Sequence, residues 1–157
     1  MTTQVQATSV TTSADVDAPV EHAFRVFTEG MNTWWNPDHH LIQNVTDMVF
    51  EPFAGGHIID RAADGSECRW SRVLTYDPPR RLVFTWDISP RWQIETDPTR
   101  SSEVEIRFVA EAERRTRVEL EHRHLDRHGD GWQGLAEGVR GDQGWRLYLQ
   151  RFAAATC

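Results

Sequence analysis

The aromatic side chains are the residues whose type and spacing point most directly to a binding site. The chain of 157 residues has seven Trp and seven Phe. Leu82, Phe84 and Trp86 fall on one face of a predicted strand, because strand side chains alternate. Trp145 and Leu149 share one face of a predicted helix. Such rings form flat apolar walls, and the indole N–H can hold a polar atom, so the pattern predicts a pocket for an apolar or aromatic molecule.

Further aromatic residues are expected around the same pocket. Trp34 and Trp35 lie in a short segment that should meet the open end of the sheet, and Trp92 lies on the loop after the Trp86 strand. The alternative is that the rings fill the core and leave no space between them. The complete predicted ligand-binding set is Trp34, Trp35, Trp70, Phe84, Trp86, Trp92, His122, Trp145 and Leu149.

Histidines could add a polar or metal-binding group to this pocket. His122 and His124 project from one face of a predicted strand and could hold zinc with a third ligand such as His128, His39 or His40. No recognised spacing supplies that ligand, and His128 falls in a polar turn, so we predict no metal. We interpret His122 as an orienting group for a ligand or as a hydrogen-bonded, partly buried side chain. We interpret His39-His40 as a solvated loop.

Catalysis in the pocket is an alternative to binding alone. Asp60, Glu67, Arg69, Arg72 and His122 could move protons. However, Asp and Arg on a strand usually face water, and the chain has no GxSxG, Cys-His, P-loop or GxGxxG motif. The sequence therefore predicts no catalytic residue and no cofactor.

Charge and composition exclude several classes of protein. There are 24 acidic and 17 basic residues, and the net charge of −7 argues against a nucleic-acid partner. No stretch approaches the ~20 apolar residues of a membrane span. Every basic residue is Arg, which excludes Lys-based covalent chemistry. The N-terminus lacks the features of a secretion signal, and Cys68 and Cys157 form no CxxC, so we expect a cytoplasmic protein.

A sheet and a C-terminal helix are the elements that must position these residues. The pattern predicts a strand over 4–16, a short helix from Pro19 to Gly30, and a second short turn or helix over 31–40. Two helices are predicted at the C-terminus, over 130–139 and from 142, with Asp142 as the N-cap of the second. Six further strands are predicted between them, over 45–51, 57–62, 68–76, 82–88, 103–111 and 117–124.

Four short runs, in order along the chain, carry a resemblance to a known family. They are Phe50–Gly56 (FEPFAGG), Asp64–Trp70 (DGSECRW), Tyr76–Trp86 (YDPPRRLVFTW) and Gly144-Trp145. With their spacing, the chain resembles, over about 10–155, the bacterial homologues of the activator of heat-shock-protein-90 ATPase, in the START-like (SRPBCC, birch-pollen-allergen-like) superfamily. The resemblance implies an α+β helix-grip fold over 1–157 as one domain. Six or seven antiparallel strands would wrap around the C-terminal helix, with two short helices after the first strand.

The resemblance also implies a function. Members of this superfamily hold lipids, polyketides and other apolar molecules between sheet and helix. We therefore expect a monomer or homodimer that binds a hydrophobic small molecule in an internal cavity. An enzyme of the cyclase or dehydratase/hydratase kind would use the same cavity, and a co-chaperone-like interaction module is a further alternative. The sequence favours binding over catalysis.

Overall fold

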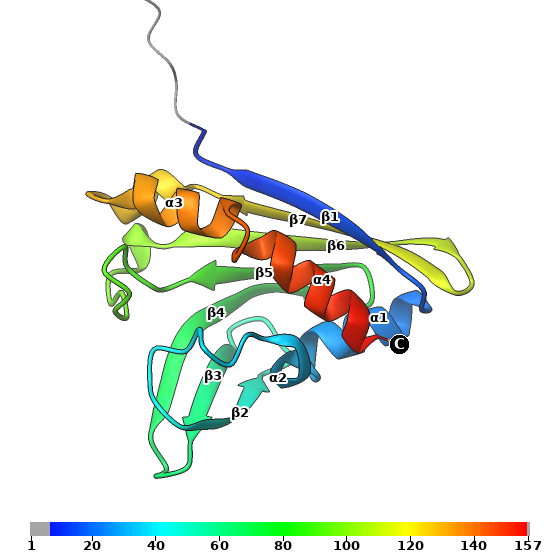
Figure 1. Ribbon diagram of the computed structural model, residues 1–157, viewed down its shortest axis with the longest axis horizontal. Helices are drawn as coiled ribbons and strands as arrows, with labels where there is room; N and C mark the ends of the chain where they lie inside the picture. The colour runs from blue at the N-terminus through cyan, green and yellow to red at the C-terminus, as the bar shows by residue number, and fades with distance from the viewer. Residues whose placement is uncertain (1–6, 157) are drawn as a thin grey trace, which may run out of the picture.

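The fold is one curved antiparallel sheet with helices on its concave side (Figure 1). The computed structural model describes residues 7–156. The seven strands lie in the order β1-β7-β6-β5-β4-β3-β2. The elements are β1 (Val10–Val16), α1 (Val20–Thr28), α2 (Met31–Trp34), β2 (Val45–Phe50), β3 (His57–Ala62), β4 (Glu67–Asp77), β5 (Arg81–Trp86), η1 (Pro98–Arg100), β6 (Ser102–Ala112), β7 (Arg115–Arg123), η2 (Leu125–His128), α3 (Trp132–Arg140) and α4 (Trp145–Ala155).

The predicted α+β helix-grip architecture is confirmed. Each predicted strand is present, with ends that differ by a few residues at most from 45 onward. The first strand begins at Val10, and the part predicted over 4–6 lies outside the described residues, as does Cys157. Gly65 closes the β3–β4 hairpin with a φ of 89°, a conformation that glycine adopts without strain.

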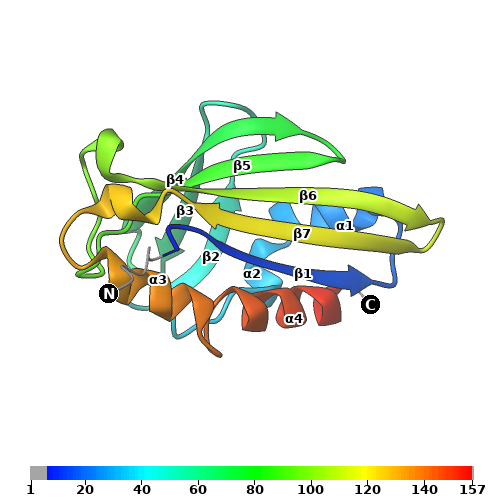
Figure 2. The same cartoon turned by 90° about the horizontal axis from the view of Figure 1, so that it is seen from above.

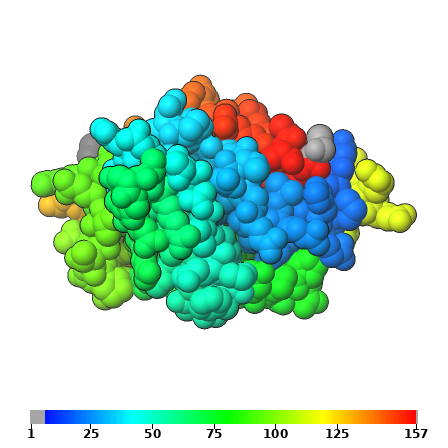
Figure 3. Space-filling model, turned by 90° about the horizontal axis from the view of Figure 1, so that it is seen from below, coloured from blue at the N-terminus to red at the C-terminus, as the bar shows by residue number. Residues whose placement is uncertain are grey.

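The core lies between the concave face of the sheet and α4. Val104, Ile106 and Phe108 on β6 are almost completely buried, as are Val118 and Leu120 on β7, which confirms the predicted alternation. Figures 1 and 2 show α4 crossing this side of the sheet and running beside β1. In Figure 3, seen from below, the segments of β2 to β4 and helix α1 form one continuous surface, with α4 at its upper margin.

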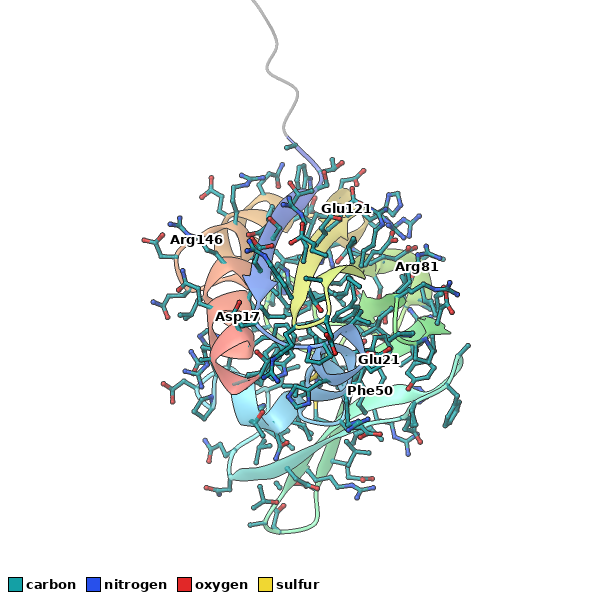
Figure 4. All side chains as sticks on the ribbon, turned by 90° about the vertical axis from the view of Figure 1, so that its right-hand side faces the viewer. Asp17, Glu21, Phe50, Arg81, Glu121 and Arg146 are labelled. Carbon is teal, nitrogen blue, oxygen red and sulfur yellow. The ribbon has the colours of Figure 1, made fainter. Side chains whose placement is uncertain are left out.

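The outer face of the sheet carries charged side chains, but one of them is not solvated. Arg81 on β5 and Arg146 on α4 lie on opposite sides of the molecule (Figure 4). Glu105 on the outer face is only 3% exposed, because Arg81, Arg107 and Arg123 cover it. The Nε atoms of Arg81 and Arg107 donate to its Oε2 at 2.7 and 2.9 Å. Burial alone would raise the pKa of Glu105, but the hydrogen bonds from Arg81, Arg123 and Arg107 together outweigh it and lower the pKa to about 2.

The junction between α3 and α4 differs from the prediction. Gly144, not Asp142, is the N-cap of α4. A Cβ atom on Gly144 would lie 2.1 Å from the carbonyl oxygen of Val139, so only glycine fits where the two helices meet. Aromatic and glycine residues at this junction also form part of the cavity described below. Across residues 7–156, none of the helices has the length and apolar character needed to cross a membrane.

Candidate functional site: an indole-walled cavity

A cavity of about 440 Å³ opens between the sheet and the α3–α4 junction. Strands β3 to β5 form one side of it, and residues 138–148 form the other. The connection from α2 to β2 covers a third side with residues 35–41. The volume lies within the range of small-molecule sites, roughly 300–1,000 Å³.

Four Trp rings and one Tyr ring line the cavity. Trp35 stacks on Tyr148 with 4.5 Å between ring centroids, and the tilted ring of Trp70 lies 5.0 Å from Trp35. Trp86 on β5 extends this row, 5.6 Å from Trp70. These rings come from α4, the α2–β2 connection and two adjacent strands, so the wall depends on the complete fold. The arrangement offers flat apolar surfaces to a ligand.

Trp92 stands at the mouth of the cavity. Its side chain is 53% exposed, and its backbone has a left-handed φ of 59°. The Trp92 N–H donates to the Ser89 carbonyl at 2.8 Å, and a single bridge between Ile88 and Ile94 closes the loop. A large ring held at this position, with strained backbone, can contact a ligand that enters from solvent.

The structure places four of the nine predicted site residues on the cavity wall: Trp35, Trp70, Trp86 and Trp92. The other five lie in the core beside it, and none of them lines the cavity in the described part of the chain. Trp34, for example, donates from its indole to the Val26 carbonyl at 3.1 Å and packs against Phe27 and Phe152. Those five are Trp34, Phe84, His122, Trp145 and Leu149.

His122 is completely buried and uses both ring nitrogens within the protein. The Trp145 indole N–H donates to its Nδ1 at 3.0 Å, and its Nε2 lies 2.6 Å from the Ser102 hydroxyl. Because Nδ1 accepts, Nε2 carries the proton and donates to Ser102. Burial, with a smaller effect of His128, lowers the pKa of His122 to about 3. His122 therefore fixes Trp145, a neighbour of the wall residue Trp86, and its ring nitrogens do not face the cavity.

His128 extends this hydrogen-bonded chain. The prediction that it lies in a polar turn is wrong, because its side chain is buried. It is 1% exposed, and its Nε2 lies 2.7 Å from the Ser102 hydroxyl. Since the Ser102 oxygen accepts from His122, its own hydroxyl donates to His128. The exposed His124 takes no part, and no cluster of three metal-binding side chains occurs between residues 7 and 156.

The polar part of the cavity is formed by residues that the sequence did not bring together. Asp60 on β3 is 2% exposed. Its Oδ1 accepts a hydrogen bond from the Trp70 indole at 3.1 Å, and its Oδ2 lies 2.8 Å from His40 Nδ1. His39 Nδ1 hydrogen-bonds to the Tyr148 hydroxyl. The prediction of a solvated loop is therefore wrong for His40, whose side chain is 10% exposed, whereas His39 remains exposed.

Asp60 could have been singled out by its setting in the sequence. It interrupts an apolar run, after Ile58 and Ile59, in a short strand whose middle is buried. A buried carboxyl group needs hydrogen-bond donors, and Asp60 was among the candidates for proton transfer. For Tyr148, the sequence pattern indicated only a helical residue that faces the core. Burial is the main cause that raises its pKa, and the charge of Asp60 acts in the same direction.

Comparison with protein-family models gave one match, "Activator of Hsp90 ATPase homolog 1-like protein", over residues 17–156. The chain belongs to this family. No curated protein matches it. This AHSA1-like chain is similar to the solved structure of Txn09, an anthrahydroquino-gamma-pyrone synthase, complexed with SUM. The identity is 42%, the match covers 94% of this chain and 96% of that one, and the TM-score is 0.68.

A second solved relative of this AHSA1-like chain is CalC from Micromonospora echinospora, described as a self-sacrificing resistance protein. It is 29% identical, with 94% of this chain and 93% of that chain covered and a TM-score of 0.65. The protein MLL2253 from Mesorhizobium loti shares the fold at 17% identity, with coverage of 94% and 95% and a TM-score of 0.66. The chain thus spans nearly the whole length of these proteins.

Proposed function

We propose that this protein binds a flat aromatic molecule of the polyketide type in the cavity. The single observation that supports this most strongly is the row of rings from Tyr148 through Trp35 and Trp70 to Trp86 beside about 440 Å³ of space. A planar polycyclic ligand would bury apolar surface against these rings, which favours binding at roughly 25 cal/mol per Å² of apolar surface. The similarity to a synthase of a fused-ring compound agrees with this ligand class.

Gly138 offers a way to block the cavity without removing any packed side chain. It lies on α3 at the cavity wall, and a Cβ atom there would meet only Trp92, at 4.0 Å. Gly134 lies one turn earlier on the same helix. Both glycines are exposed, but Gly134 does not line the cavity, and a Cβ atom added to it would have no neighbour within 4 Å. Leu at 138 would therefore occupy the cavity mouth, whereas Leu at 134 would extend into solvent.

The test is a titration with 2-methoxyanthraquinone, a flat neutral probe, followed by the quenching of tryptophan fluorescence. We expect saturable binding to the unmodified protein, at least tenfold weaker binding to Gly138→Leu, and no change for Gly134→Leu. A tenfold loss corresponds to about 1.4 kcal/mol. Absence of saturable quenching in the unmodified protein, or equal binding by the two variants, would reject the proposed site.

A second candidate function is an enzyme that closes a ring in the bound molecule. Two observations favour it: the similarity to a γ-pyrone synthase and the His40–Asp60 pair at the cavity wall. A pyrone ring contains an oxygen atom, and closure through a hydroxyl group requires removal of its proton. A group that accepts this proton would turn a binding cavity into a catalytic one.

A further inference from the structure

Asp60 holds two hydrogen-bond donors, one on each carboxyl oxygen. The Trp70 indole fixes Oδ1 at 3.1 Å and His40 Nδ1 fixes Oδ2 at 2.8 Å. Trp70, His40 and Asp60 all line the cavity, and the His40 and Asp60 side chains are 10% and 3% exposed. The Asp60 carboxyl group therefore fixes the orientation of the His40 imidazole, and the Trp70 indole in turn holds that carboxyl group in place.

This contact determines which nitrogen of His40 is available to a ligand. A carboxylate only accepts hydrogen bonds, so His40 donates from Nδ1. In the neutral ring the other nitrogen, Nε2, then has a free lone pair. No described residue hydrogen-bonds to Nε2, while the ring forms part of the cavity wall. An imidazole oriented in this way by a buried carboxylate is the arrangement that removes protons in general-base catalysis.

The other ionisable groups around the cavity leave this role to His40. Asp38, His39 and Tyr148 complete the titratable wall residues, and the wall includes no Arg within residues 7–156. His39 Nδ1 is bound to the Tyr148 hydroxyl, and burial raises the pKa of Tyr148, which keeps its proton. Cys68, beside Asp60 on β4, is buried, and its pKa is raised to about 11 by burial and by the Asp60 charge.

We propose that His40 is the general base of the cavity, which takes the proton of a weakly acidic aromatic hydroxyl group, and that Asp60 is the residue that positions it. The ligand O–H bond breaks, a new N–H bond forms at His40 Nε2, and the oxygen keeps the electron pair. The resulting imidazolium lies between two negative charges, the ligand oxygen and the Asp60 carboxylate, which stabilise it. The proton returns when the ligand leaves or reacts. This inference rests on the proposed function, since it needs an aromatic ligand in the cavity.

Two probes separate this inference from the proposed function. The first is 2-methoxyanthraquinone, which has no acidic proton, and the second is 2-hydroxyanthraquinone, whose anion absorbs at longer wavelength than its neutral form. If the methoxy probe does not bind, the proposed function fails. If both probes bind, a spectrophotometric pH titration measures the ionisation of the bound hydroxyl group. We expect it to ionise at least about one pH unit lower than in free solution, the shift typical of a nearby opposite charge.

Three variants assign the effect to the two residues. His40→Asn keeps an N–H near Asp60 but has no base, so the shift should disappear. Asp60→Asn would donate to Nδ1 and move the His40 proton to Nε2, so the shift should also disappear. His57→Asn is the matched control, because His57 faces Glu51 at 3.5 Å on the surface, away from the cavity wall; it should keep the full shift.

A measurement on the unmodified protein decides the question even if a variant does not fold. The ¹⁵N chemical shifts of His40 report which ring nitrogen carries a proton. We expect the Nδ1–H form in the free protein and with the methoxy probe, and a doubly protonated ring with the hydroxy probe. A hydroxyl group that ionises as in free solution, a shift that survives in His40→Asn, or a His40 ring that stays neutral with the hydroxy probe would each overturn the inference.

Discussion

The buried His122 makes the stability of this protein sensitive to mild acid. The fold holds the neutral ring, because burial and His128 lower the pKa of His122 to about 3 from an ordinary value of 6.5. Its contribution is complete above pH 6.5 and is lost as the pH falls below that value, since the unfolded state then binds a proton that the folded state does not. At pH 5 this lowers the free energy of unfolding by about 2 kcal/mol.

The assay is urea unfolding at pH 7 and pH 5, followed by tryptophan fluorescence, for three proteins. The unmodified chain should lose at least about 2 kcal/mol between the two pH values, because His128, with its pKa lowered to about 4, acts in the same direction. In His122→Asn this loss should shrink by about 2 kcal/mol. His124→Asn is the control, since His124 is exposed and has a left-handed φ of 60° that Asn tolerates.

Two results would refute this reasoning. One is a pH dependence that is the same in His122→Asn and in the unmodified chain. The other is a His122 ring that becomes protonated between pH 7 and pH 5 in an NMR titration of the folded protein, a measurement that does not depend on the variant being stable.

The remaining predictions concern the helix junction and the outer face of the sheet. Gly144→Ala should lower the free energy of unfolding by roughly 1–3 kcal/mol, because its Cβ meets the Val139 carbonyl. Gly134→Ala, at an exposed position of α3, should be neutral or slightly stabilising. Denaturant unfolding that ranks the two variants the other way would contradict the geometry. Glu105→Gln should cost about 1–3 kcal/mol at pH 7, because the carboxylate that pairs with Arg123 and two other Arg is lost. The loss of unfolding free energy in Glu105→Gln should shrink as the pH falls below about 4.5, since the pKa of Glu105 is lowered to about 2 in the folded chain. A loss that does not depend on pH would show that the charge of Glu105 is unimportant.

Much of the fold could be predicted from local patterns in the sequence. The alternation of Val104, Ile106 and Phe108 with charged residues defines one buried face, and period two depends only on the strand itself. The same pattern could not show that Glu105 is buried by three Arg side chains, because two of them come from other strands. The boundary at Gly144 was missed because it depends on the close approach of α4 to Val139.

The site was less accessible to sequence reasoning for a related reason. Periodicity shows which side of a helix or strand faces inward, but not whether an inward ring borders empty space. Trp86 lines the cavity, whereas Trp145, 5.7 Å from it, is packed in the core. The His40–Asp60 contact joins a loop to a strand 20 residues later, and no local pattern specifies such a pair.

The most direct test of the central claim is a crystal structure of the protein with 2-hydroxyanthraquinone. We predict that the ring system lies against Trp35, Trp70 and Trp86, with its hydroxyl oxygen within hydrogen-bond distance of His40 Nε2. A probe bound on the outer surface, or an interior that stays free of the probe at concentrations that saturate fluorescence quenching, would contradict the account.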